Sequence, residues 1–372
     1  MNSEIQQAKK ILIRGVNWLG DAVMSMPSVS ALRAAFPDAT IALLTHKKLI
    51  DIWMKNPDLN EIIPLEENLC SVAKKIRHHK FDLAIAFPNS HRSAIELWLG
   101  GVKERVGYNG FLRSLFLTRT VDQPHKFVKL KKLTPRLVKS IIEGKSKHPY
   151  AFDSRFHHIH NYLALVRAVG AKEKIAEPRI EVIWDELMEA KNKFNLKNSN
   201  LIAINPGAEY GPAKRWLKER FAQAAIELCK KTNCDICITG GKGDLLRCLE
   251  IARTINEKLG KMAAVNLSGQ TTLRELCAVF KLCNVVISND TGPMHLAAAS
   301  GSRVVAIFGS TSPELTRPGL PGSTRHAIVK STQPCSPCFL RNCPIDFRCM
   351  RSITVEQVVN AAMRLLSEQN KI

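Results

Sequence analysis

Three segments of this chain combine glycine with acidic or basic side chains, in patterns that suit a phosphorylated ligand. Residues 15–21 read G-V-N-W-L-G-D and bring Asp21 to the start of an expected helix. Residues 205–216 read N-P-G-A-E-Y-G-P-A-K-R-W and end in the adjacent cations Lys214 and Arg215, which can neutralise a pyrophosphate. Residues 288–295 read S-N-D-T-G-P-M-H, and the first amides of the helix that opens there suit a diphosphate.

Each segment also has a simpler interpretation. An aspartate before a helix, such as Asp21, is commonly a helix cap, and Asp290 could cap the next helix or hold sugar hydroxyls. Lys214 and Arg215 could be surface cations, although the rigid loop and Trp216 favour a functional role. A glycine cluster at residues 240–244, G-G-K-G-D, could lie against a nucleoside and is weak evidence by itself.

Strand and helix patterns alternate along both halves of the chain. The expected strands are residues 11–14, 40–45, 61–65, 81–87, 201–205, 235–239, 265–267, 284–288 and 304–308. The expected helices are residues 22–36, 69–79, 218–230, 245–255, 272–282, 293–299 and 355–368. This rhythm predicts an α/β protein with two Rossmann-like domains, whose parallel sheets face a central cleft. The loops that follow the strands should carry the chemistry.

Domain limits follow from the same pattern. We expect residues 1–185 to form the first domain, with a basic insert at about 118–162, and residues 186–352 to form the second. Residues 353–372 form a last helix with apolar residues at helical spacing, which we expect to pack back toward the first domain: Val358, Val359, Ala362 and Leu365.

Composition restricts the partners. The 372 residues carry a formal net charge of +21, which favours an anionic partner: nucleic acid, membrane phospholipid or a phosphorylated glycolipid. Only 6% of the residues are aromatic and no nucleic-acid-binding motif stands out, so nucleic acid is disfavoured. No run of eighteen apolar residues and no signal-peptide core occur, which predicts a soluble, cytoplasmic protein.

The eleven cysteines call for two interpretations. Seven lie in apolar patterns, where cysteine acts as a small hydrophobe, and this favours reduced thiols. The other group, Cys335-x-x-Cys338 with Cys343 and Cys349, resembles a metal-ligand cluster, and four thiolates would satisfy a structural zinc ion. Free or reversibly paired thiols are the alternative.

The segments G-D-A-V-M-S-M-P, N-P-G-A-E-Y-G-P-A-K-R-W and N-D-T-G-P-M-H-L-A-A-A together resemble the signatures of glycosyltransferase family 9, the heptosyltransferases of lipopolysaccharide inner-core synthesis. The middle segment resembles the heptosyltransferase II branch, and the resemblance runs from about Lys10 to Val359. It implies the GT-B architecture. It also implies inverting, metal-independent transfer of heptose from ADP-L-glycero-β-D-manno-heptose to the first heptose of the inner core, at the cytoplasmic face of the inner membrane, with no required cofactor.

The resemblance also implies roles for individual residues. Asp21 matches the family's general base, and Lys214 matches the lysine that steadies the departing diphosphate, with Arg215 assisting. Asp290 matches the acidic residue that orients the donor sugar. The remaining expected donor-binding residues are Thr291, Gly292, Lys242, Asp244 and Glu209.

The same resemblance implies a binding partner for the basic insert. We expect Lys129, Lys131, Lys132 and Arg136 to dock a phosphorylated, Kdo-bearing lipid A at an anionic membrane surface, although a solvated helix face is the alternative. Heptosyltransferase I, or a family 9 enzyme with a different acceptor, remains an alternative function. A non-catalytic nucleotide- or membrane-binding protein is a second alternative.

Overall fold

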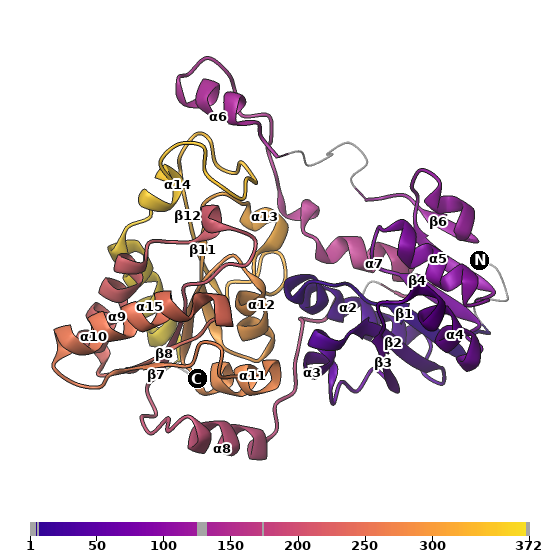
Figure 1. The fold of residues 1–372 in the computed structure, drawn as a ribbon, viewed down its shortest axis with the longest axis horizontal. Helices are drawn as coiled ribbons and strands as arrows, with labels where there is room; N and C mark the ends of the chain where they lie inside the picture. Colours follow the sequence, from indigo (N-terminus) through magenta and orange to yellow (C-terminus); the bar gives the residue numbers. More distant parts are fainter. Residues whose placement is uncertain (1–4, 6, 125–131, 173–174, 370–372) are drawn as a thin grey trace. The chain divides into compact units, whose positions relative to one another are not determined.

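The structure of this chain is a computed structural model, which describes residues 5, 7–124, 132–172 and 175–369 (Figure 1). The chain forms two compact units. The first unit comprises Met1–Lys129 and His158–Glu181, and the second comprises Leu130–His157 and Val182–Ile372. Each unit is described by itself below.

The first unit is built on a six-stranded parallel sheet in the order β3-β2-β1-β4-β5-β6. Its strands are β1 (Lys10–Arg14), β2 (Thr40–His46), β3 (Glu61–Leu65), β4 (Leu83–Ala86), β5 (Glu104–Tyr108) and β6 (Arg119–Val121). Its helices are α2 (Leu19–Ala35), α3 (Ile50–Trp53), α4 (Leu69–His79), α5 (His91–Leu99) and α7 (Ile159–Arg167), with 3-10 turns at Lys47–Leu49 and Arg113–Phe116. The helices α4 and α5 pack together on one face, and α2 packs with α7.

The second unit repeats this architecture with the order β12-β11-β10-β7-β8-β9, again entirely parallel. Its strands are β7 (Leu201–Asn205), β8 (Asp235–Ile238), β9 (Ala264–Asn266), β10 (Val285–Asn289), β11 (Arg303–Phe308) and β12 (Ala327–Lys330). Its helices are α6 (Pro135–Ile142), α8 (Trp184–Lys193), α9 (Lys218–Thr232), α10 (Leu245–Leu259), α11 (Leu273–Leu282), α12 (Gly292–Ala299), α13 (Pro313–Thr316), α14 (Arg348–Arg351) and α15 (Val355–Gln369). Short 3-10 turns lie at Ser154–Phe156, Pro212–Lys214 and Lys242–Asp244. The predicted α/β fold with two parallel sheets is confirmed.

Both sheets reverse their strand order at one point, between β1 and β4 in the first unit and between β7 and β10 in the second. Ligands of open parallel sheets bind outside the carboxyl ends of the strands at such switch points. The three segments singled out in the sequence follow β1, β7 and β10. Each segment therefore lies at the carboxyl edge of its own sheet, where ligands bind in this kind of fold.

The central part of the expected insert groups with the second unit, whereas we expected the whole insert in the first domain. Residues 130–157 join the second unit, and Val138 and Ile141 of α6 share an apolar cluster with Cys335 and Cys338. The amide of Leu133 donates to the Cys338 carbonyl across 3.0 Å. We call residues 132–157 and 335–347 together the insert–tail lobe. Apolar periodicity shows that α6 needs a partner but not which part of the chain supplies it.

The prediction for the last helix is also wrong. Val358, Val359, Ala362 and Leu365 of α15 are buried in the core of the second sheet, and α15 packs beside α9. The start of α15 is anchored there because the Trp216 indole donates to the Ile353 carbonyl across 3.1 Å. In the described part of the chain, no helix has the length and apolar character needed to cross a bilayer.

Candidate active site

The loop after β1 carries Asp21 into the first turn of α2. The residue before this helix, Trp18, makes no side-chain capping bond, and Asp21 is the third residue of the helix rather than its cap. The interpretation of Asp21 as the helix cap is therefore wrong. Its half-buried carboxylate instead accepts a hydrogen bond of 3.0 Å from the Tyr162 hydroxyl of α7.

Tyr162 was missed in the sequence because nothing local links it to residue 21. Burial, and then the charge of Asp21, hold the pKa of Tyr162 well above its usual range, so the phenol remains a hydrogen-bond donor. Its ring lies against Phe87, which directly follows β4, with the ring centroids 5.5 Å apart. A rigid phenol therefore fixes one oxygen of the Asp21 carboxylate.

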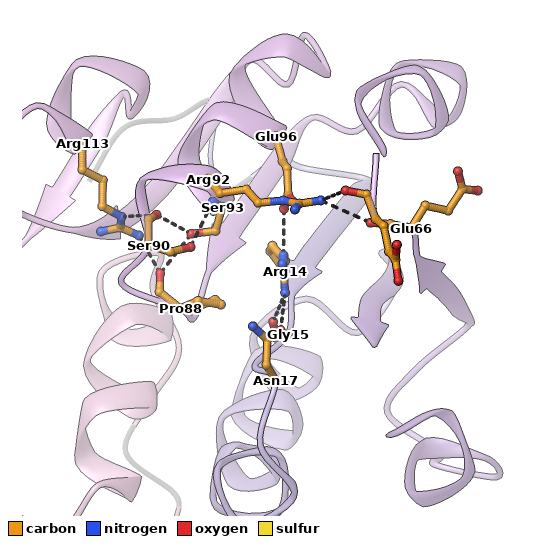
Figure 2. Close-up of polar contacts among 11 residues, drawn as sticks. Arg14, Gly15, Asn17, Glu66, Pro88, Ser90, Arg92, Ser93, Glu96 and Arg113 are labelled. Carbon is orange, nitrogen blue, oxygen red and sulfur yellow. Dashed lines mark hydrogen bonds and ion pairs between the residues drawn. The ribbon is translucent and has the colours of Figure 1, made fainter. Parts of the chain in front are cut away.

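A buried ion pair lies beneath the same loop (Figure 2). Arg14, the last residue of β1, places its Nε 2.9 Å from Glu96 Oε2, and the two side chains are 3% and 0% exposed. The Arg14 Nη1 donates to the Gly15 carbonyl across 2.6 Å and to Asn17 Oδ1 across 3.3 Å. Arg92 Nε contacts the other Glu96 oxygen at 2.8 Å. This network connects α5 to the loop that precedes α2.

In the second unit, buried Asn289 fastens the loop after β7 to the end of β10. Its Nδ2 donates to the carbonyls of Pro206 and Gly207 across 3.0 and 3.2 Å. Its Oδ1 accepts from the amide of Trp216 across 3.0 Å. One side chain thus fixes both ends of the loop that holds Lys214. The sequence contained Asn289 in a recognised segment, but its side-chain bonds depend on β7 and β10 being neighbours.

Lys214 and Asp290 form the central pair of this unit. Lys214 Nζ lies 2.6 Å from Asp290 Oδ2 and 3.2 Å from the Asp290 carbonyl oxygen. Thr311 and Thr316 also donate to the Asp290 carboxylate, across 2.6 and 3.2 Å. Burial alone would raise the pKa of Asp290, but the Lys214 ammonium and the hydroxyl bonds outweigh it and hold that pKa below its usual range. The Asp290 carboxylate is therefore ionised, and both of its oxygens accept hydrogen bonds.

A second basic residue lies near the glycine cluster. Arg215 approaches Asp244, with Nη2 4.0 Å from Oδ1, and the amide of Gly241 donates to Asp244 Oδ2 across 3.3 Å. A Cβ atom on Gly207 would collide with the Asp244 carboxylate, so the lack of a side chain at residue 207 leaves room for Asp244 in its present position. Lys242 is exposed on the 3-10 turn that ends at Asp244.

The remaining donor-side predictions lie on the same loops. Thr291 precedes α12 without a side-chain capping bond, and Gly292 is the first residue of that helix. This leaves the helix start without a capping side chain, as an anion site at a helix N-terminus requires. Glu209 is exposed on the loop after β7. His295 is buried one turn inside α12.

The insert–tail lobe brings further cations to this loop. Lys132 is exposed and lies 5.5 Å from the ring centroid of Tyr210, while Lys214 and Arg341 lie 5.1 and 5.2 Å from it. The Tyr210 hydroxyl donates to the Phe339 carbonyl across 2.8 Å. Two further predicted docking residues, Lys129 and Lys131, lie outside the described residues, and Arg136 is exposed in the first turn of α6. Sequence analysis did not single out Arg341, and it assigned no role to Tyr210 although that residue lies within residues 205–216.

Gly211 allows the tail to reach this loop. Its φ of +154° is a conformation that other residues rarely adopt, and a Cβ there would lie 2.6 Å from the Arg341 carbonyl oxygen. The amide of Ala213 donates to that same oxygen across 3.0 Å. The tail therefore supports the backbone of the Lys214 loop directly.

The cysteines of the tail do not form the zinc site that their spacing suggested. Within the described residues, no group of three or more histidine, cysteine or acidic side chains could hold a metal ion. Cys335 and Cys338 lie in the apolar cluster of the insert–tail lobe, and Cys349 lies in the core of the second sheet. Burial raises the pKa of each of these three thiols, so each remains protonated in the described structure.

Two Rossmann-like units of the same strand order define a fold of the GT-B type, and the pair of Lys214 and Asp290 lies at the carboxyl edge of the second sheet. The model of one family, glycosyltransferase family 9 (heptosyltransferase), matches residues 142–347, more than half of the chain. The chain belongs to this family.

Relatives along nearly the whole chain agree with this assignment. Lipopolysaccharide heptosyltransferase 2 of Escherichia coli K12 is 28% identical over 83% of this chain and 85% of its own length. Lipooligosaccharide heptosyltransferase 2 of Campylobacter jejuni (serotype O:2) is 27% identical over 97% of this chain and 99% of its own. The solved structure of E. coli ADP-heptose lps heptosyltransferase II has a TM-score of 0.77 at 24% identity, covering 97% of this chain and 99% of that one.

Proposed function

We propose that this chain transfers heptose from ADP-L-glycero-β-D-manno-heptose to the first heptose of the lipopolysaccharide inner core, with inversion and without a metal. The observation that carries the proposal is the pair of Lys214 with the buried Asp290, because it holds an ammonium group where strand-end loops bind phosphates. The choice of substrates is supported by relatives called heptosyltransferase 2 and by a solved structure called ADP-heptose heptosyltransferase II.

In the proposed reaction, Asp21 accepts the proton of the acceptor hydroxyl while that oxygen attacks the anomeric carbon of the donor. The bond from the anomeric carbon to the phosphate oxygen breaks, and ADP leaves with the bonding electrons. Attack from the face opposite the leaving group inverts the configuration. A carboxylate suits the role of base because the transition state is oxocarbenium-like and tolerates nearby negative charge.

The departing diphosphate requires positive charge. Lys214 supplies it in our proposal, assisted by Arg215 and by the start of α12 at Thr291 and Gly292. Asp290 keeps the ammonium of Lys214 in place through the 2.6 Å contact. The orienting role of Asp290 toward the donor sugar stays a prediction, as do nucleotide-side roles for Lys242, Asp244 and Glu209.

The acceptor in this proposal is Kdo-lipid A that bears one heptose, reached from the cytoplasmic face of the inner membrane. A net charge of +21 supports peripheral binding at an anionic lipid surface. Lys132 and Arg136 of the insert–tail lobe are exposed cations that could dock this acceptor. No nucleic acid takes part.

The decisive experiment incubates purified protein with ADP-heptose and two acceptors, one without heptose and one with a single heptose, and detects products by mass spectrometry. Transfer to the one-heptose acceptor is the expected result. Asp21→Asn should abolish transfer while leaving the affinity for ADP unchanged, because the base is lost and the phosphate site is kept.

Other outcomes point elsewhere. Transfer to the heptose-free acceptor alone would indicate heptosyltransferase I activity. The absence of ADP release with both acceptors would favour a non-catalytic binding protein. Normal turnover by Asp21→Asn would remove Asp21 from the role of base.

A further inference from the structure

We propose that Arg14, held in place by the buried carboxylate of Glu96, positions the loop that brings Asp21 to its substrate. This inference rests on the proposed function, since it concerns the residue that we take as the base. Neither Glu96 nor Arg14 contacts the Asp21 side chain in the described structure, and both are therefore positioning residues rather than catalytic ones. Figure 2 shows their arrangement.

The first step is the burial of the pair. Glu96 is completely buried, and a buried carboxylate must be compensated by charge and hydrogen bonds. Arg92 provides one contact at 2.8 Å, but its side chain is 48% exposed. Arg14 is 3% exposed and contacts the other carboxylate oxygen. A buried ion pair is weak evidence for stability, because desolvation offsets most of the attraction. Its geometry is therefore the informative feature.

The second step is the direction of the Arg14 fork. Its Nε donates a hydrogen bond to Glu96. With Nε held there, Nη1 donates to the Gly15 carbonyl and to Asn17 Oδ1. Arginine holds such a planar fork rigidly, whereas a lysine at the same place has a single mobile ammonium group. Glu96 thus determines where Arg14 donates, and Arg14 determines the path of residues 15–17.

The third step links this path to Asp21. The helix α2 starts after Trp18 without a side-chain cap, so local capping does not fix its first turn. The Arg14 bond to Asn17 holds the residue directly before Trp18, and Asp21 lies four residues after Asn17. Tyr162 fixes the carboxylate itself. The base is consequently held at two points, through its backbone and through its side chain.

A matched comparison lies nearby in the same unit. Arg113 is also buried, and its guanidinium donates to the backbone carbonyls of Pro88, Ser90 and Tyr108. It braces the loop after β4 and makes no contact with residues 15–17 in the described structure. Arg113→Lys therefore controls for the general cost of replacing a buried arginine.

The test measures kcat, KM for the donor, ADP affinity by calorimetry and melting temperature for three variants. Asn17→Ala removes an exposed side chain and should leave the fold intact. Arg14→Lys keeps the charge beside Glu96 but loses the fork. We expect kcat to fall by about 10- to 100-fold in both, as for small displacements of a reacting group. Donor KM and ADP affinity should not change. Arg113→Lys should lower the melting temperature and retain kcat.

The double variant Arg14→Lys with Asn17→Ala makes the test specific. If one bond carries the effect, the double variant should be no slower than the slower single variant. Asn17→Asp keeps an acceptor for Arg14 and should retain most of the turnover. Multiplicative losses in the double variant would mean that Asn17 acts by touching substrate, and full activity of both single variants would overturn the positioning role.

The two proposals fail in different ways. If Asp21→Asn retains turnover, the assigned base is wrong and the proposed mechanism fails with it. If Asp21→Asn is inactive while Asn17→Ala and Arg14→Lys are fully active, the mechanism stands and only the positioning role is lost.

Discussion

Tyr162 donates a hydrogen bond to the Asp21 carboxylate across 3.0 Å and so joins α7 to the first turn of α2. The two residues are 141 positions apart in the chain. The chain passes through the insert before it returns to the first unit at His158. The candidate base is thus oriented by a residue that follows residues 130–157, the segment that belongs to the second unit.

Replacing Tyr162 by phenylalanine should slow turnover without weakening donor binding. A hydrogen bond to a charged group contributes about 1.5–3 kcal/mol, and its loss from an orienting contact corresponds to roughly a 10- to 100-fold fall in kcat. Initial rates at saturating donor, together with ADP affinity by calorimetry, measure the effect. Tyr108→Phe is the control, because that buried phenol also donates to a backbone carbonyl, of Asn161, but does not touch Asp21. Equal kcat losses in both variants would mean that the Tyr162 bond is merely structural.

Breaking the Lys214–Asp290 pair from one side should cost both stability and activity. Lys214→Met leaves the buried Asp290 carboxylate without its cation, which should lower the free energy of unfolding by about 3 kcal/mol. The double variant Lys214→Met with Asp290→Asn should recover most of this stability and none of the transfer activity. Urea denaturation and the transfer assay give the two readouts. Activity in the double variant would exclude Lys214 from charge neutralisation.

The segments of the candidate site could be recognised in the sequence because they are short and lie next to strand ends. The alternation of strands and helices predicts parallel sheets, and the loops after β1, β7 and β10 each lie at the carboxyl edge of the sheet to which the strand belongs. The bonds of Asn289, Thr311 and Thr316 could not be predicted. Each joins segments far apart in the chain, and only the pairing of β7, β10 and β11 brings them together.

The exposed cations of the insert–tail lobe should act on the acceptor and not on the donor. Lys132→Glu with Arg136→Glu should raise the KM for a lipid-bound acceptor by about 30-fold or more at low salt, since each basic residue near an anionic surface contributes about 1 kcal/mol. The difference should shrink as salt screens the charges. Lys230→Glu with Lys231→Glu, an equal charge change on exposed residues at the end of α9, is the control. If the KM for the acceptor is unchanged at low salt, these cations form only a solvated helix face and do not dock the acceptor.

His326 should make the protein sensitive to mild acid. Its Nδ1 accepts a hydrogen bond of 3.2 Å from the amide of Val304, and burial, followed by the charge of Arg325, lowers its pKa from 6.5 to about 3. The unfolded chain therefore binds a proton between these values while the folded chain does not. The free energy of unfolding should fall by up to about 1.4 kcal/mol per pH unit as the pH drops from 6.5 toward 3.

The comparison of pH profiles isolates this residue. His326→Gln retains an acceptor for the Val304 amide and removes the titrating ring, so chemical denaturation at several pH values should show a flatter dependence over the same range. Parallel profiles for the two proteins would assign the acid sensitivity to other groups.

The elements missed in the sequence share a physical cause. The missed strand β12 has only four residues, and the missed strand β5 contains Gly107 beside the buried Arg113. Neither strand has the long β-branched run that marks a central strand.

The cysteine spacing wrongly suggested a zinc site for a related reason. The C-x-x-C pattern is compatible with metal ligation, but the helix α6 of the insert covers Cys335 and Cys338 with apolar side chains. Sequence spacing cannot reveal which surface a thiol faces.

The membership of residues 130–157 in the second unit makes that unit discontinuous along the gene. A fragment that starts at Val182 would lack Leu133, Val138 and Ile141, and would leave Cys335 and Cys338 uncovered and prone to oxidation or aggregation. Dissection of the protein into halves therefore needs a circular permutation, or a linker that reattaches the excised piece. A simple truncation between Glu181 and Val182 would remove part of a folding unit.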